Sequence, residues 1–301
     1  MCGLFGFSDP KHTLTQKQIR RLTGNLATAS EQRGTDASGI AYVQGQTLRI
    51  YKRPLPAHSM TWLVPAHTTA VMGHTRMTTQ GSSAFNPNNH PFPGMCGDTR
   101  FALAHNGVLH NDDALKQRCH LPKTNIQTDS YVAVQLLEQD GRLDAEAIGN
   151  TAARLEGSFS LTILNQFNHL YLVKGNSPLC IYRFENGLIC YASTADILKE
   201  ALARCGFLPR SKEIITYHFD IGEFDMVVFD LKAASCAIYK VEYSTEITEA
   251  QYRHLIDEEK CKATEWRFGT ITGKYVIYRG ESCEVNGIHY LNVEEYLKGL
   301  A

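Results

Sequence analysis

Cys2 and the α-amine that removal of Met1 would leave on it are the first groups in the chain that could do chemistry. A cysteine thiol has a pKa of about 8.5 and an α-amine one of about 8, so the amine can take up the thiol proton near neutral pH. A thiolate made in this way attacks a carbonyl carbon without a histidine as general base. The initiator methionine is usually removed ahead of a small residue, so Cys2 is predicted to be an N-terminal nucleophile.

Four polar motifs follow Cys2 along the chain. They are RGTDASG (residues 33–39), GHTRMTTQG (73–81), HNG (105–107) and TDS (128–130). Each motif has an ordinary structural explanation when it is taken alone. Arg33 and Asp36 could form a surface ion pair, and Asp129 could cap the helix that follows it. Asn106-Gly107 is a common tight turn.

Together and in this order, the motifs resemble the glutaminase domain of the class II glutamine amidotransferases, nearest to the glucosamine-6-phosphate synthase type. Further matching pieces across residues 2–240 are MCGLFGF, NNHPF, AHNGVLHN, TDSYVAVQLLE, LEGSFSLTIL, GNSPLCIY and YASTADIL. The resemblance implies an α+β fold, the four-layer αββα sandwich of the N-terminal nucleophile hydrolases. It also implies an enzyme that hydrolyses the side-chain amide of L-glutamine to glutamate and ammonia, through a γ-glutamyl thioester on Cys2.

The resemblance also assigns roles to the polar residues. The side-chain amide of Asn106 and the backbone N–H of Gly107 would stabilise the oxyanion that forms when the thiolate attacks the amide. Arg76 would pair with the α-carboxylate of glutamine, which a planar guanidinium can bind through two hydrogen bonds. Asp129 would bind the α-amine.

Two weaker correspondences and two departures lie in the same motifs. Thr79 aligns with a family threonine beside the carboxylate site, and Arg33 with an arginine near the nucleophile that either contacts substrate or organises the site. Met77 stands where the family usually has an aromatic residue, and Gln80 where the synthase branch has a histidine. Because that aromatic residue belongs to a loop that closes over glutamine, we expect the coupling between substrate binding and activation by a partner to differ.

The residues after the resemblance do not supply an ammonia acceptor. Residues 241–301 are too few for the synthase domains that relatives join to their glutaminase domain, and no SGGxDS or Walker A phosphate loop is present. We therefore expect a glutaminase that passes ammonia to a separate synthase subunit. Two alternatives stay open: a free-standing hydrolase of γ-glutamyl amides, and a regulatory module that senses glutamine with little turnover.

Composition is typical of a globular cytoplasmic protein. The 301 residues are 43% apolar and 20% charged, with a formal net charge of −1 and no long basic cluster, so neither nucleic acid nor an anionic membrane is an expected partner. No apolar stretch has the length of a membrane span, and no secretory signal is present. Nine cysteines without a CxxC pair indicate reduced thiols, and no histidine spacing follows a ligand pattern, so we expect no metal and no cofactor.

Hydrophobic periodicity predicts the elements that would position these residues. Helices are expected at 15–31, 129–139, 144–155 and 195–204, and strands at 38–43, 48–53, 70–76, 101–106, 159–164, 169–173, 179–184, 188–192, 213–219, 225–231 and 236–241. Residues 81–99 are rich in Gly, Pro and Asn and are expected to be disordered or to form a functional loop. The expected domains are 2–240 and a small C-terminal α/β appendage over 241–301, with a helix at 248–264, a hairpin at 285–288 and a helix at 293–300.

Overall fold

The structure is a computed structural model that describes residues 2–206, 211–217, 224–230 and 233–298. Contacts within the chain divide it into two compact units. Unit 1 consists of residues 1–179 and 186–209, and unit 2 of residues 180–185 and 210–301. The expected boundary at residue 240 therefore lies inside unit 2, and the separate role of residues 241–301 stays a prediction.

One sheet of unit 1 carries the N-terminal strand at an interior position, between two other strands. In spatial order its strands are β10 (Ile189–Ala192), β1 (Gly3–Ser8), β4 (Ala70–Arg76), β2 (Ala37–Gln44) and β3 (Thr47–Arg53). The pairs of β1 with β10 and β4, and of β2 with β3 and β4, are all antiparallel. Strands β1 and β4 are buried along almost their whole length, which explains their nearly continuous apolar and small residues.

The second sheet of unit 1 has four antiparallel strands. Their order is β5 (Phe92–Cys96), β6 (Thr99–Leu109), β7 (Gly157–Asn165) and β8 (Leu170–Lys174). Contacts of β4 with β6 and β7, and of β2 with β7, place this sheet face to face with the first. Strand β6 is the longest strand of these two sheets, and it is buried over most of its length.

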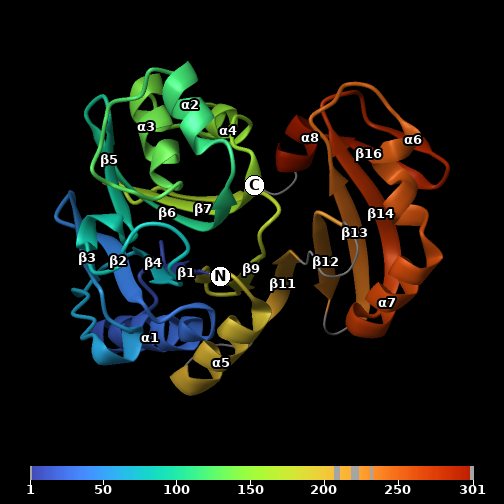
Figure 1. Cartoon of the computed structure of the whole chain (residues 1–301). Coiled ribbons are helices and arrows are strands. Elements are labelled where there is room, and N and C mark those ends of the chain that lie inside the picture. The colour runs from blue at the N-terminus through green and yellow to red at the C-terminus, as the bar shows by residue number, and fades with distance from the viewer. Residues whose placement is uncertain (1, 207–210, 218–223, 231–232, 299–301) are drawn as a thin grey trace. The chain divides into compact units, whose positions relative to one another are not determined.

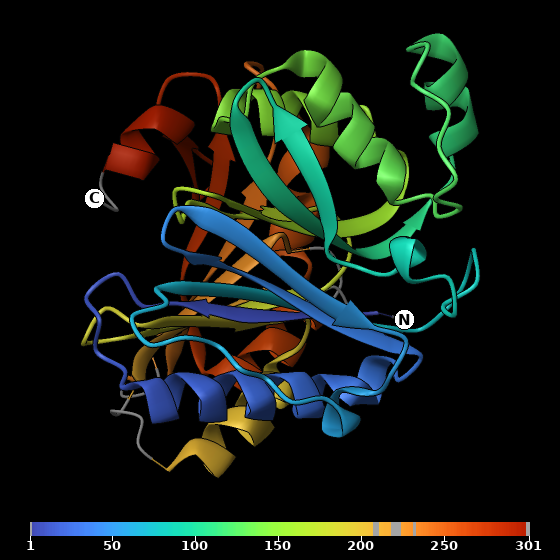
Figure 2. The same ribbon diagram turned by 90° about the vertical axis from the view of Figure 1, so that its left-hand side faces the viewer.

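Helices cover the outer face of each sheet. Helices α1 (Gln16–Ala29) and α5 (Ala195–Cys205) pack on each other and on the first sheet, while α3 (Tyr131–Asp140) and α4 (Ala145–Ala152) pack on the second, with α2 (Asp112–Arg118) beside α3. Short 3-10 helices lie at η1 (Ser30–Arg33), η2 (Ala57–Ser59) and η3 (Asn86–Asn88). Unit 1 is thus an αββα sandwich with four layers, as expected (Figures 1 and 2).

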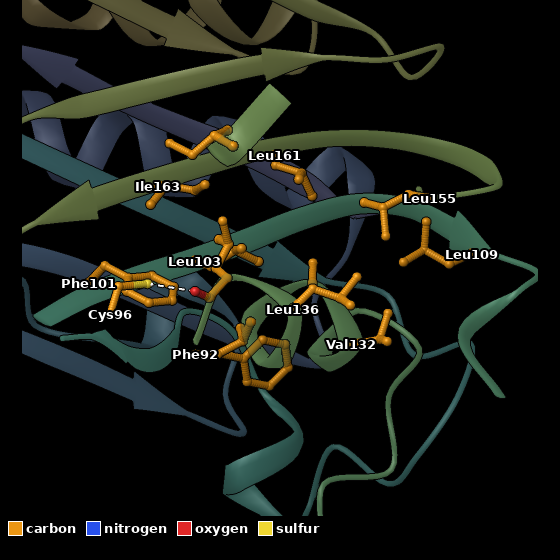
Figure 3. Packing of buried hydrophobic residues seen from close by; sticks show 14 of the residues in the cluster. Phe92, Cys96, Phe101, Leu103, Leu109, Val132, Leu136, Leu155, Leu161 and Ile163 are labelled. Carbon is orange, nitrogen blue, oxygen red and sulfur yellow. Dashed lines mark hydrogen bonds between the residues drawn. The ribbon is translucent and has the colours of Figure 1, made fainter. Parts of the chain in front are cut away.

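The best-defined core of unit 1 lies between the second sheet and its helices (Figure 3). The side chains that meet there include Phe101 and Leu103 from β6, Leu161 from β7, and Val132 and Leu136 from α3. Because side chains alternate along a strand, the odd-numbered positions of β6 face this helical layer and the even-numbered ones face the other sheet. This alternation decides where the polar residues of β6 point.

Unit 2 contains a sheet of mixed direction. Its order is β15 (Cys283–Val285), β16 (Ile288–Asn292), β14 (Thr270–Tyr278), β13 (Ser235–Val241), β12 (Met226–Asp230), β11 (Ser211–Tyr217) and β9 (Leu179–Phe184). The pairs β13–β14 and β14–β16 are parallel, and the others for which the register is defined are antiparallel. The helices are α6 (Glu249–Tyr252), the 3-10 helix η4 (Arg253–Ile256), α7 (Glu258–Phe268), which packs on β13 and β14, and α8 (Val293–Lys298).

Most expected elements are confirmed within a few residues. The capping box of Thr15 and Gln18 opens α1, with the Thr15 N–H donating to Gln18 Oε1 at 2.8 Å. The expected hairpin forms between β15 and β16 with Asn286 and Gly287 at positive φ. The parts of two expected elements at residues 218–219 and 299–300 lie outside the described residues.

Three expectations were wrong in part. Residues 81–99 are not a continuous loop, because they contain η3 and β5, and β5 pairs with β6 along its length. The helix expected at 248–264 is divided into α6, η4 and α7. Strands β1 and β14 and helix α2 were not expected, although the alternation of β-branched and aromatic residues in TITGKYVIY is a strand signal.

Candidate active site

Cys2 lies directly before β1 and is partly exposed. The Nε–H of Arg33 donates to the backbone carbonyl of Cys2 at 2.7 Å, and the Cys2 Sγ lies 3.5 Å from the carbonyl oxygen of Met77. Arg33 ends η1, which follows α1 without a break, so the helix presents this guanidinium to the start of the chain. Of the two roles considered for Arg33, the hydrogen bond supports the one of organising the site around Cys2.

The surroundings of the Cys2 thiol favour its protonated form. Burial raises the pKa of the thiol, and the hydrogen bond with the Met77 backbone and the positive charges of Arg76 and Arg33 oppose that rise only in part. Burial penalises the thiolate more than the two cations stabilise it. A reaction that uses this sulfur therefore needs a base close by, because little thiolate is present at neutral pH.

Arg76 is buried at the end of β4 and is held by three hydrogen bonds. Its Nη1 donates to Asn89 Oδ1 at 2.7 Å, and its Nη2 donates to the carbonyls of Gln80 at 2.6 Å and Gly81 at 2.9 Å. Burial lowers the pKa of Arg76, while the nearby Cys2, Asp36 and Asp129 raise it. A guanidinium has five N–H donors, so contacts within the described chain leave two of them for another acceptor.

Gln80 joins Arg76 to Asp129. The carbonyl of Gln80 accepts from Arg76, and its side-chain Oε1 accepts the backbone N–H of Asp129 at 2.9 Å. The carboxylate of Asp129 is buried and accepts the N–H of Leu109, the last residue of β6, at 2.6 Å. Gln80, which departs from the family pattern, thus connects the two residues expected to hold the ends of glutamine.

Asn106 is an even-numbered residue of β6, so its side chain faces the first sheet. Its Nδ2 donates to Ser193 Oγ at 3.5 Å, and the same oxygen accepts the backbone N–H of Leu4 at 2.8 Å. Both Asn106 and Ser193 are buried. Ser193 therefore links the amide of Asn106 to the strand that begins one residue after Cys2.

Gly107 could not be replaced by another residue without a change in the backbone. Its φ is +144°, which residues with a side chain rarely adopt. A Cβ at this position would lie 1.8 Å from the carbonyl oxygen of Ser158 on the paired strand β7. The absence of a side chain at Gly107 lets β6 and β7 come close together at the position of the expected oxyanion donors, Asn106 and Gly107.

The structure brings together most of the predicted site residues but not all. Cys2, Arg33, Arg76, Asp129 and Asn106 are connected through the contacts above, and Gly107 follows Asn106 on β6. Thr79 lies apart from these contacts. It is exposed in the segment after β4, and its hydroxyl makes no hydrogen bond within the described residues.

Ser193 and Asn89 were missed as functional candidates. Both lie inside motifs that match the family, YASTADIL and NNHPF, but neither motif shows which distant side chain its polar residues contact. Ser193 accepts a hydrogen bond from Asn106, 87 positions away in the sequence, and Asn89 accepts one from Arg76, 13 positions away. A Ser or Asn in a matched motif is the only signal that could have identified them.

Three buried histidines lie behind the site. The rings of His74 and His90 lie in contact at a tilt of 33° with centroids 4.1 Å apart, and His74 Nε2 lies 3.0 Å from the carbonyl oxygen of His105. Burial lowers the pKa of all three, that of His74 to about 3, so the rings are neutral at pH 7. In the described part of the chain, no group of three or more His, Cys, Asp or Glu side chains could hold a metal ion.

Comparison with known proteins supports the same assignment. Residues 74–200 match the family described as glutamine amidotransferase domain. The chain is 28% identical over 301 residues to a glutamine–fructose-6-phosphate aminotransferase (isomerizing) of Listeria monocytogenes, covering 95% of this chain and 46% of that protein. It is 33% identical over 193 residues to the protein of the same name from Bacillus subtilis, covering 60% and 30%. The chain thus spans half or less of the length of these relatives.

Two solved structures share the fold of most of this chain. The glutamine phosphoribosylpyrophosphate amidotransferase of Bacillus subtilis matches 76% of this chain and 49% of its own, with a TM-score of 0.56 and 20% sequence identity. The allosteric regulatory enzyme of purine biosynthesis matches the same shares with a TM-score of 0.55 and 21% identity. No helix in the described residues is long and apolar enough to cross a membrane. The family match over residues 74–200, the relatives and the shared fold together support a class II glutamine amidotransferase domain in this chain.

Proposed function

We propose that this chain hydrolyses the side-chain amide of glutamine with Cys2 as the nucleophile and passes the ammonia to a separate synthase. The observation that carries the proposal is the link from Leu4 through Ser193 to Asn106, which ties an amide donor to β1, the strand that directly follows Cys2. A nucleophile and an oxyanion donor from two facing sheets are what attack on an amide requires. A module that only bound glutamine would not need this pair.

The first step makes the thioester. The α-amine of Cys2, free once Met1 is removed, takes the proton of the Cys2 thiol, and the sulfur bonds to the δ-carbon of glutamine. The carbonyl oxygen becomes an oxyanion that the Asn106 amide and the Gly107 N–H stabilise. The carbon–nitrogen bond then breaks, and the nitrogen leaves as ammonia with the proton returned from the α-amine.

The second step releases glutamate. Water attacks the γ-glutamyl thioester with the α-amine again as base, a second oxyanion forms in the same place, and the carbon–sulfur bond breaks to give glutamate and the thiol. Because burial raises the pKa of the Cys2 thiol, the sulfur takes a proton readily as it leaves. The same burial makes the adjacent base necessary for the first step.

Arg76 and Asp129 would hold the far end of glutamine. The two N–H groups that Arg76 does not use on Asn89, Gln80 and Gly81 are on Nε and Nη1, and either can donate to the α-carboxylate. Asp129 is fixed to β6 by the N–H of Leu109 and can accept from the α-ammonium. Since β6 also carries Asn106 and Gly107, one strand would set the distance from the substrate amine to its amide.

The two relatives are named glutamine–fructose-6-phosphate aminotransferases, and this chain matches half or less of their length. We propose that a separate synthase binds the acceptor of the ammonia. A synthase subunit that co-purifies with the chain is the expected partner.

The test measures ammonia and glutamate released from glutamine, together with the intact mass of the preparation. Chain that has lost Met1 is expected to be active, and chain that retains Met1 inactive, because the α-amine is then absent from Cys2. Cys2→Ala is expected to abolish turnover while glutamine still binds by calorimetry. Full activity in chain whose mass includes Met1, or in Cys2→Ala, would contradict the mechanism.

A further inference from the structure

Ser130 directly precedes helix α3, yet its hydroxyl does not cap that helix. A serine in this position ordinarily accepts a backbone N–H from the first turn of the helix. Here the side chain is buried and makes two other contacts. Its Oγ lies 3.2 Å from Asp129 Oδ1 and 2.7 Å from His105 Nδ1.

His105 fixes the direction of this hydroxyl. It occupies an odd-numbered position of β6, so its ring points toward α3, away from the side on which Asn106 lies. Burial lowers the pKa of His105 although the charge of Asp129 raises it, so the ring is neutral at pH 7 and carries one N–H. The two ring nitrogens face Ser130 Oγ at 2.7 Å (Nδ1) and the Ser158 carbonyl oxygen at 3.3 Å (Nε2). The shorter contact and the negative charge of Asp129 favour the proton on Nδ1, so the ring donates to Ser130 Oγ and the Ser130 hydroxyl donates to Asp129 Oδ1.

Both carboxylate oxygens of Asp129 are then held by hydrogen bonds that lead to residues of β6, one directly and one through Ser130. Oδ2 accepts directly from the N–H of Leu109, and Oδ1 accepts from Ser130, which is held by His105. A carboxylate with both oxygens bonded cannot rotate freely, so the lone pairs that stay available point in fixed directions. The strand that holds them is the one that carries Asn106 and Gly107.

We infer that Ser130 is a positioning residue that aims the Asp129 carboxylate at the α-ammonium of the substrate and so makes the site select amides that carry an α-amino group. This inference rests on the proposed function, because Asp129 receives the ammonium only if glutamine is the substrate. Ser130 itself touches no substrate atom. Its effect should therefore appear only with substrates that have the amine.

The experiment compares glutamine with glutaramate, the same amide without the α-amino group. Ser130→Ala is expected to raise KM for glutamine about tenfold with a small change in kcat, the effect of losing one hydrogen bond to a charged group. Turnover of glutaramate is expected to change less than about twofold, since this substrate has no ammonium for Asp129. Ser130→Thr, which keeps the hydroxyl, is expected to restore the KM for glutamine.

Thr151→Ala is the matched control for loss of a buried hydroxyl. Thr151 lies on α4, is buried, and donates to the carboxylate of Asp140 at 3.3 Å. This variant should leave the preference for glutamine over glutaramate unchanged. An equal loss with both substrates in Ser130→Ala, or no loss with either, would overturn the inference while the proposed function stands.

Binding to the Cys2→Ala protein gives the same comparison without turnover. Adding Ser130→Ala to that protein is expected to weaken glutamine about tenfold and glutaramate by less than about twofold. Glutamine that binds tightly to Cys2→Ala but equally tightly to the double variant would again overturn the role of Ser130. Absence of both glutamine binding and turnover in the unaltered chain would instead remove the proposed function, and this inference with it.

Discussion

Asn106 is the residue whose replacement best separates chemistry from binding. Its amide stabilises charge that exists only in the transition state, so Asn106→Ala is expected to lower kcat about a hundredfold or more, with KM nearly unchanged. Steady-state kinetics with glutamine measure both constants. Ser193→Ala removes only the oxygen that holds the amide, at 3.5 Å, and should lower kcat less than Asn106→Ala does.

Arg76→Lys supplies the opposite pattern and serves as the control. A lysine ammonium has three N–H donors, and the three hydrogen bonds to Asn89, Gln80 and Gly81 would use all of them, so none would remain for a carboxylate. KM should therefore rise by more than about tenfold while kcat falls less. If Asn106→Ala raised KM and left kcat unchanged, the oxyanion assignment would be wrong.

At the scale of residues, the sequence predicted the groups of the site better than the contacts between them. Cys2, Arg76, Asn106 and Asp129 stand in motifs whose residue types already suggest the chemistry. The contact of Ser130 with His105 and the bridge through Ser193 depend on which strands face each other. Residue types alone do not contain that information, because a serine hydroxyl can bond to any nearby group.

At the scale of elements, the close approach of β6 and β7 gives a stability prediction. In Gly107→Ala the new Cβ meets the carbonyl of Ser158 and the backbone keeps a strained φ, so the free energy of unfolding should fall by about 3 kcal/mol or more.

Gly149→Ala is the matched control. Gly149 is exposed within α4 with nothing near its missing Cβ, so alanine should add about 0.5–1 kcal/mol. Urea denaturation of both variants tests this, and equal stabilities would contradict the contact.

The histidines that join β4 to β6 predict acid sensitivity. His74 has a pKa near 6.5 when unfolded and about 3 when folded, because burial disfavours its charged form. The unfolded chain then binds the extra proton first, so the stability from this group is present above pH 6.5 and is lost as the pH falls. Between pH 7 and pH 5 one such group lowers the free energy of unfolding by about 2 kcal/mol.

Urea denaturation at pH 7, 6 and 5 measures this slope. His90→Phe is the informative variant, because a phenyl ring keeps the ring contacts with His74 and Phe92 and cannot take up a proton. Burial also lowers the pKa of His90, so the loss of stability toward pH 5 should be smaller in the variant than in the unaltered chain. The same slope in both proteins would mean that other groups control the acid sensitivity.

Elements were predicted where a periodic pattern was long, as in α1 and β7, and were missed where the pattern was short or broken by Gly and Pro. Strand β5 (Phe92–Cys96) contains both Pro93 and Gly94, which ordinarily argue against a strand. It forms because it lies at the edge of its sheet, where a residue without an N–H is tolerated. Only the position in the sheet, which sequence periodicity does not give, resolves such a segment.

At the scale of the whole molecule, the division into units follows strand pairing rather than chain order. Strand β9 is grouped with unit 2, although β10, which follows it closely, belongs to unit 1. Strand β14 lies between β13 and β16 in the sheet, so removal of residues after 245 would leave β13 without its parallel partner. A composition shift near residue 241 could not reveal this, because the partners of a strand are set by tertiary packing.

The proposed transfer of ammonia predicts how the chain responds to a partner. Residues 77–80 are exposed, and Met77 replaces the usual aromatic residue there. The Met77 carbonyl contacts Cys2 Sγ, and Gln80 joins Arg76 to Asp129. Closure of an exposed segment over substrate needs added binding energy, which the synthase would supply. We expect low glutaminase activity for the chain alone and a higher kcat/KM for glutamine when the co-purifying synthase is added.

Because deletion would disrupt unit 2, a surface substitution is the better test of where that partner binds. Trp266 on α7 is 91% exposed, and large exposed aromatic side chains often contribute most to an interface. Trp266→Ala is expected to reduce the stimulation by the synthase at least about fivefold without altering the activity of the chain alone. Phe167 is an exposed aromatic residue of unit 1, and Phe167→Ala should change neither the stimulation nor the basal activity. The measurement is kcat/KM for glutamine with and without the synthase. Unchanged stimulation in Trp266→Ala would mean that Trp266 does not contribute to binding of the synthase. High activity of the unaltered chain that no partner increases would favour a free-standing amidohydrolase.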